Sequence, residues 1–90
     1  MTDQKWREMK LRNLAAQLIL HVKEVALRGE GMSRFLFIIG NDKAAEISWN
    51  HDGTLWAEFW DEIGKDTGPV AEATFGDIDE AKDAIIKKLM

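Results

Sequence analysis

The sequence predicts an α+β fold in two layers, in which a four-stranded, mostly antiparallel sheet carries two helices on one face. Three observations lead to this prediction. A long N-terminal segment has helical periodicity, a central stretch has the pattern of a complete β-hairpin, and a capping signal near the C-terminus opens a second helix. The predicted element order is α-β-β-β-β-α. We expect residues 1–90 to form a single domain, because a chain of this length can build one core.

The first predicted helix covers residues 3–28, and Gly29 and Gly31 follow it as stop signals. At about 100° per residue its apolar side chains form one broad face. This face comprises Leu11, Leu14, Ala15, Leu18, Ile19, Val22, Val25 and Ala26. A narrower apolar line beside it is expected to pack on the C-terminal helix, or else on a second subunit. That line comprises Met9, Ala16, Leu20 and Leu27.

The central hairpin turns through residues 50–54, which have the chemistry of a three-residue loop. Asn50 can cap the turn with its side chain, and Gly53 can adopt the positive φ that the bulge requires. Counting outward from this loop places Ile47 opposite Ala57. One face of the hairpin is then uniformly apolar, and we assign it to the core.

The same register defines what lies on the other face of the hairpin. It places Glu46 opposite Glu58 and turns the two indoles of the second strand, Trp56 and Trp60, to one side. A two-residue turn is the competing interpretation. It would set Ile47 against Glu58 and leave neither face apolar, so we reject it.

The apolar run at residues 34–39 predicts a strand that is central in the sheet or covered on both faces. If residues 41–42 form the loop to the hairpin, Leu36 turns to the core. Phe35 and Phe37 then lie on the outer face beside the two indoles. The loop chemistry alone leaves this register open.

The last two elements follow a loop at residues 64–69. Residues 70–75 predict a short fourth strand with Pro69 at its beginning, where a missing donor is tolerated. Asp77 and Glu80 have the spacing of a capping box that opens the second helix. Its apolar stripe comprises Ile78, Ala81, Ile85 and Leu89.

Composition excludes several classes of protein. The chain has no cysteine, so disulfides, zinc–thiolate sites and thiol nucleophiles are excluded, and a cytoplasmic location is the expectation. The longest apolar run, residues 14–20, is too short to cross a bilayer. The net charge of −4 is uneven, because residues 1–28 carry six basic and three acidic side chains whereas residues 29–76 carry three and nine.

No catalytic, metal or cofactor site is predicted. The oxygen-rich stretches at residues 50–52 and 61–66 lack the spacing of a calcium loop, and turn chemistry explains them. The chain has no nucleophile elbow. A Glu46/Glu58 pair resembles a general acid/base dyad in composition, but on an open sheet face its pKa shift should be small.

The leading functional hypothesis is therefore a small, non-enzymatic protein-interaction module, with self-association left open. Interfaces favour a few aromatic anchors surrounded by polar groups, and the outer sheet face has this composition. The expected partner-binding residues are Trp56, Trp60, Glu46, Glu58, Phe35 and Phe37.

The alternative is a nucleic-acid-binding domain that uses the basic side chains of the first helix, Lys5, Arg7, Lys10 and Arg12. The order helix, three strands, helix is that of a double-stranded-RNA-binding domain. However, a fourth strand is predicted, and the second helix begins with acidic residues where that family is basic. No family resemblance is therefore claimed. A carboxylate-based hydrolase is a distant third hypothesis.

Overall fold

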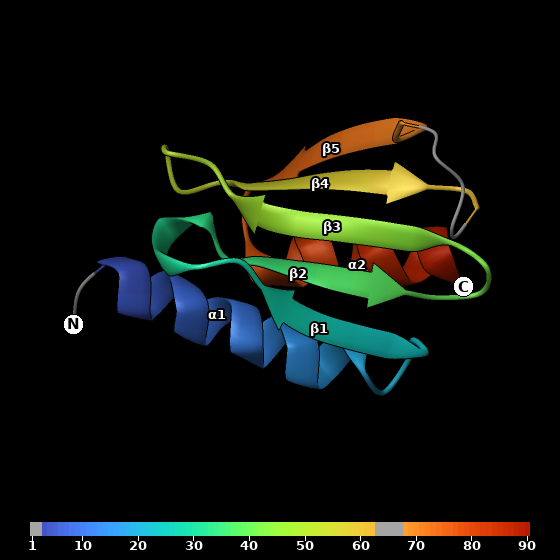
Figure 1. Cartoon of the computed structure of the whole chain (residues 1–90), viewed down its shortest axis with the longest axis horizontal. Helices are drawn as coiled ribbons and strands as arrows, with labels where there is room; N and C mark the ends of the chain where they lie inside the picture. The colour runs from blue at the N-terminus through green and yellow to red at the C-terminus, as the bar shows by residue number, and fades with distance from the viewer. Residues whose placement is uncertain (1–2, 63–67) are drawn as a thin grey trace.

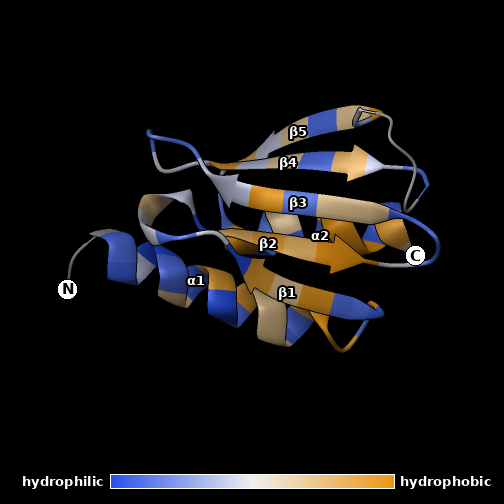
Figure 2. Ribbon diagram, viewed as in Figure 1, coloured by the Kyte–Doolittle hydropathy of each residue, from blue (hydrophilic) through white to orange (hydrophobic). Residues whose placement is uncertain are grey.

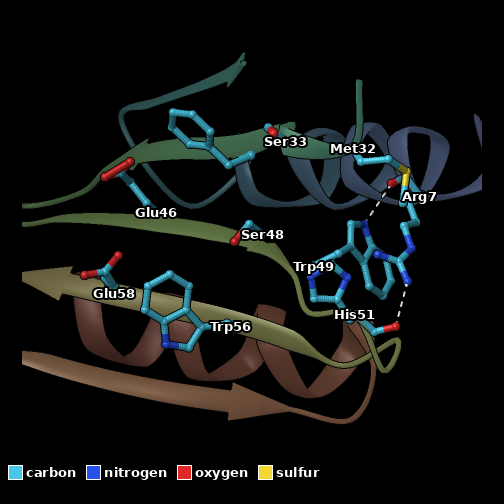
Figure 3. A pocket seen from close by; sticks show the side chains of 10 residues that line it. Arg7, Met32, Ser33, Glu46, Ser48, Trp49, His51, Trp56 and Glu58 are labelled. Carbon is cyan, nitrogen blue, oxygen red and sulfur yellow. Dashed lines mark hydrogen bonds between the residues drawn. The ribbon is translucent and has the colours of Figure 1, made fainter. Parts of the chain in front are cut away.

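Five antiparallel strands form a single sheet in the computed structural model, which describes residues 3–62 and 68–90 (Figure 1). The spatial order of the strands, β1-β2-β3-β4-β5, is their order in the chain, so each strand pairs with the next one. Both helices lie on the same face of this sheet (Figures 1 and 3). The elements are α1 (Asp3–Leu18), β1 (Glu24–Arg28), the short 3-10 helix η1 (Gly31–Ser33), β2 (Phe35–Ile39), β3 (Ala44–Trp49), β4 (Leu55–Trp60), β5 (Ala71–Phe75) and α2 (Ile78–Leu89).

The prediction of a four-stranded sheet preceded by a helix over residues 3–28 is wrong. Helix α1 ends at Leu18, and residues 24–28 form β1, which pairs with β2 so that Val25 lies opposite Ile38. The reason is the apolar strand β2. Its backbone needs ladder partners on both sides, and β3 supplies only one of them. Val25 and Leu27 fit a helical pattern, but they also fit the inward positions of a strand. Pairing with β2 therefore decides in favour of the strand.

The hairpin of β3 and β4 has the predicted register, with Ile47 opposite Ala57. The loop closes as its residue types require. The Asn50 N–H donates to the Thr54 carbonyl (2.8 Å), and the Asn50 side-chain amide donates to the Thr54 hydroxyl (2.9 Å). Gly53 has φ of 89°, the left-handed conformation that favours glycine.

The register between β2 and β3, which the loop chemistry left open, is the one given by a two-residue turn. Ile39 lies opposite Ala44, and Leu36 lies opposite Ile47. Asp42 in the turn has φ of 61°, a conformation that Asp tolerates better than most residues. Leu36 therefore faces the core, while Phe35 and Phe37 face the other side of the sheet.

The core lies between the sheet and the two helices. Hydrophobic residues are concentrated along β1 and β2 and on α2, whereas the turn between β2 and β3 is polar (Figure 2). Neither helix in the described part of the chain is long and apolar enough to span a membrane. The largest side chains that are fully buried are Leu11, Leu14, Leu18, Leu36, Ile38, Ile47, Leu55, Ile85 and Leu89.

Helix α2 begins with the predicted cap. The Asp77 carboxylate accepts a hydrogen bond from the Glu80 N–H (2.8 Å), and the Glu80 carboxylate accepts one from the Gly76 N–H (3.2 Å). At its other end the Leu89 carbonyl accepts a hydrogen bond from the Asn41 N–H (2.9 Å). The C-terminus of α2 is therefore fastened to the turn between β2 and β3.

This attachment leaves no room beside Gly40. A Cβ atom at this position would lie 2.6 Å from both the Cβ and the carbonyl oxygen of Leu89. We predict that Gly40→Ala lowers the free energy of unfolding by about 1–3 kcal/mol, because the helix end must shift. Gly68→Ala is the matched control, since no atom of the described residues lies within 4 Å of the Cβ it would add, and it should stay within about 0.5 kcal/mol of wild type. Urea unfolding measures both, and equal stability of the two variants would contradict the tight packing of α2 on the turn.

Candidate functional site

The outer face is the side of the sheet that neither helix covers (Figure 3). All five strands contribute alternate residues to it, because successive side chains of a strand point to opposite faces. All six residues predicted for partner binding lie on this face, and each of them is half-buried. On β2 to β4 the outer face carries Phe35, Phe37, Ile39, Ala44, Glu46, Ser48, Trp56, Glu58 and Trp60, and β5 adds Glu72 and Thr74.

Three carboxylates line up across the middle of the outer face. Glu46 lies directly opposite Glu58, and Glu58 lies directly opposite Glu72 on the next strand. We call these three residues the carboxylate row. Like charges that face one another across strands are destabilising, so the row costs stability that the core must supply. Sequence analysis missed Glu72, because its place depends on the pairing of β5 with β4, for which no turn chemistry was available.

Electrostatics single out the central member of the carboxylate row. The pKa of Glu58 is raised above its ordinary value, first by partial removal from water and then by the charges of Glu72 and Glu46. Within the described residues, no basic side chain forms an ion pair with any of the three. The basic residue that the strands place on this face is Arg28 of β1, whose guanidinium lies 4.3 Å from the centre of the Phe37 ring.

Aromatic side chains flank the carboxylate row. Trp56 and Trp60 stand two residues before and after Glu58 on β4, so the central carboxylate lies between two indoles on the same face. On β2, Phe37 lies opposite Glu46 and Phe35 lies opposite Ser48. The outer face thus combines apolar rings with negative charge over strands β2 to β5.

A shallow hollow of about 460 Å³ opens on this face and runs to the end of the sheet where β3 meets α1 (Figure 3). Glu46 and Glu58 lie at one end of the hollow, while Arg7 and His51 lie at the other (Figure 3). The hollow is lined by Arg7, Met32, Ser33, Phe35, Glu46, Ser48, Trp49, His51, Trp56 and Glu58. Its two ends therefore carry different charge.

Trp49 ties the start of α1 to the end of β3. Its Nε1–H donates to the Arg7 carbonyl (3.1 Å), and its ring lies 5.4 Å from the Trp6 ring, centre to centre. The Arg7 guanidinium lies 5.6 Å from the centre of the Trp49 ring. Trp49 lies opposite Leu55 on the helix side of the sheet, and nothing in the sequence linked it to Trp6 across 43 positions.

The basic residues of α1 are engaged in several separate contacts. Arg12 forms an ion pair with Glu8 (3.3 Å), and the other oxygen of Glu8 pairs with Arg34 (3.1 Å). Lys10 lies over the ring of Trp6, 5.6 Å from its centre. The basic side chains of α1 therefore contact different carboxylate and aromatic partners. They do not form one continuous basic surface.

The oxygen-rich hairpin loop serves the turn. The Asp52 carboxylate accepts hydrogen bonds from the hydroxyl (2.6 Å) and the N–H (3.0 Å) of Thr54. These bonds hold the pKa of Asp52 below its ordinary value. In residues 3–62 and 68–90, no three acidic or histidine side chains are arranged to hold a metal ion. The second oxygen-rich stretch, residues 61–66, lies mostly outside the described residues.

Comparison of the chain with models of protein families, with curated proteins and with solved structures found no match.

The carboxylate row leads to a prediction about stability and pH. Because the pKa of Glu58 is raised in the folded chain, the folded state binds this proton more tightly than the unfolded state does. The cost of ionised Glu58 is therefore present above the raised pKa and disappears as the pH falls through it. Glu58→Gln should be more stable than wild type at pH 7, by about 0.2–1 kcal/mol, with the difference shrinking towards about pH 4.

Urea unfolding at a series of pH values measures this difference. Glu30→Gln is the matched control, because Glu30 is an exposed carboxylate outside the sheet. Its stability should follow that of wild type within about 0.5 kcal/mol at each pH. A Glu58→Gln variant that is less stable than wild type at pH 7 would show that the ionised carboxylate makes a favourable contact, contrary to the repulsion described above.

Proposed function

We propose that this chain is a non-enzymatic protein-interaction module that binds its partner through the outer face. The observation that carries the proposal is the group of four aromatic side chains on a sheet face that neither helix covers. Phe35, Phe37, Trp56 and Trp60 are half-buried, so part of each ring still contacts solvent. A partner that covers these rings removes that remaining surface from water.

Burial of these rings would contribute favourable free energy to association. Removal of apolar surface from water contributes roughly 25 cal/mol per Å², and an aromatic side chain offers about 150–250 Å² in total. Even if half of that area is already buried in the free chain, each indole can contribute about 2 kcal/mol to association. Aromatic residues at the centre of a patch with polar groups around them have the composition of interaction hot spots.

The negative charge of the outer face makes a symmetric dimer through this face less favourable than binding of a different protein. In a two-fold symmetric dimer through this face, the carboxylate row of one copy would meet that of the other, and like charges in an interface cost several kcal/mol. We therefore favour a different protein as the partner over a second copy of the chain. Self-association is the second form of this proposal, and a measurement of the mass in solution distinguishes the two.

We predict that Trp56→Ser together with Trp60→Ser abolishes partner binding while the chain still unfolds in one cooperative transition. Neither indole contributes to the core between sheet and helices, so folding should tolerate the change. The measurement compares the proteins that immobilised wild-type chain and double variant retain from a lysate of the source cells, quantified by mass spectrometry. At least one protein should be retained by wild type and lost with the double variant.

Trp6→Ser is the matched control for removal of a solvent-accessible indole, because Trp6 is 42% exposed and lies on α1 away from the outer face. It should retain the same proteins as wild type. If the double variant fails to unfold cooperatively in urea, the two indoles are part of what holds the fold together and the site assignment is wrong. If it folds and retains the same proteins as wild type, the outer face is not the binding surface.

Nucleic-acid binding is the second candidate, because the structure brings Lys10 and Trp6 together on α1, and a cation beside an aromatic ring suits a nucleotide. The charges around Lys10 and Trp6 disfavour nucleic-acid binding. The hollow beside these two residues, of about 400 Å³, is also lined by Asp77 and Asp79, whose charges repel phosphate. The chain as a whole carries a net charge of −4.

We therefore predict only weak, salt-sensitive association with nucleic acid. Titration of labelled duplex and single-stranded RNA and DNA at about 150 mM salt tests this, and dissociation constants above about 100 μM are expected. Submicromolar binding that weakens when Lys10 and Arg12 are both changed to Ala would place the nucleic-acid function first.

A further inference from the structure

We infer that the partner presents a basic segment to the outer face, with an Arg or Lys side chain seated against the carboxylate row between Trp56 and Trp60. This inference rests on the proposed function and names the chemistry of the partner at that same face. Three independent features support it: the charge of the face, the placement of its aromatic rings, and the polarity of the hollow.

The first feature is uncompensated negative charge at the centre of the outer face. Glu46, Glu58 and Glu72 are neighbours across three strands, and in the described residues none of them has a basic partner within ion-pairing distance. A cation from outside would relieve the repulsion among the three carboxylates as well as pair with them. The free energy of binding a cation at this position therefore includes the relief of the repulsion that is present in the free chain.

The second feature is that the rings adjoin the carboxylate row on the same face. Trp56 and Trp60 flank Glu58 at two residues on either side, so a cation at Glu58 lies within reach of two indole faces. The chain already shows this type of contact on the same face, where the Arg28 guanidinium lies 4.3 Å from the centre of the Phe37 ring. Guanidinium suits the site better than ammonium, because its planar fork can pair with a carboxylate while it stacks on a ring.

The third feature is the polarity of the hollow of about 460 Å³ that the row adjoins. Its far end carries Arg7 beside the loop residue His51, so positive charge along the whole length of a bound segment would meet repulsion there (Figure 3). Met32, Phe35 and Trp56 also line the hollow and offer apolar walls. The segment that fits has its basic residues grouped at one end and apolar residues beside them.

Other occupants of the face fit less well. A second copy bound symmetrically would set one carboxylate row against another. A single metal ion is not favoured, because the three carboxylates are not arranged to hold one. A membrane surface of anionic lipids would be repelled by the row.

The inference is tested by selecting peptides from a displayed library of random 12-residue sequences on the immobilised full-length chain. Selected peptides are synthesised, and backbone amide shifts of the wild-type chain identify those that bind at β3, β4 and β5. We expect these peptides to carry a net positive charge, with Arg or Lys grouped towards one end. Their affinity should fall about tenfold or more in the triple variant Glu46→Gln, Glu58→Gln, Glu72→Gln.

The matched control removes the same number of charges elsewhere on the surface, through Glu30→Gln, Asp42→Asn and Asp83→Asn. All three of these carboxylates are exposed and lie outside the strands. This control should change the affinity by about twofold or less, since it alters only the long-range field.

The outcomes separate this inference from the proposed function. Peptides that bind at the outer face but are neutral or acidic, or that bind the triple Gln variant as tightly as wild type, overturn the basic partner and leave the interaction face standing. A library that yields no peptide at the outer face overturns both. Basic peptides at the outer face that lose affinity in the triple variant, and not in the control variant, support both.

Discussion

The burial of side chains from both helices against one face of the sheet is the interaction on which the rest of this structure depends. Leu14 of α1 and Ile85 of α2 are completely removed from solvent, as are Leu36 and Ile47 on the inner face of the sheet. A two-layer chain of this size has only one such core. Because both helices pack on one face, no helix or strand of the described residues covers the other face, and side chains of the strands themselves partly shield it. The half-buried aromatic rings of the outer face partly fill this role.

The outer face then carries a local conflict that the core does not explain. A polar face could have been made of threonine, lysine and glutamate in alternation, which pair favourably across strands. Instead, the central strands β3 and β4 place Glu46 opposite Glu58, and β5 extends the repulsion with Glu72. Natural proteins tend to break local rules of this kind at functional sites and to compensate elsewhere. The conflict is a second observation, beside the aromatic rings, that supports the proposal of a binding surface on this face.

The parts of the fold that local chemistry determines were predictable from the sequence. The hairpin loop has residue types that permit few alternatives, and the cap of α2 depends on residues close together in the chain. The first strand was not predictable in this way. Residues 24–28 satisfy a helical period and a strand alternation equally, and no glycine or proline marks the break after Leu18. The feature that indicates a strand here is the apolar strand β2, whose backbone requires a hydrogen-bonding partner strand on each side. The same dependence on distant pairing concealed Glu72, so the acidic part of the candidate site was predicted incompletely.

The early end of α1 also shapes the candidate site. Because residues 24–28 leave the helix and join the sheet, Arg28 reaches the outer face and stacks on Phe37 instead of extending the basic side of α1. It lies on β1, two strands away from β3, where the carboxylate row begins. At the β1 edge the outer face therefore carries both the Arg28 guanidinium and the Glu24 carboxylate, whereas the charged residues that β3 to β5 place on it are all acidic. A partner lying across the strands meets both signs, and a partner lying along β4 towards the hairpin loop meets the carboxylates at one end and Arg7 at the other. The grouping of basic residues expected in the partner follows from the hollow along β3 and β4, which has carboxylates at one end and Arg7 at the other.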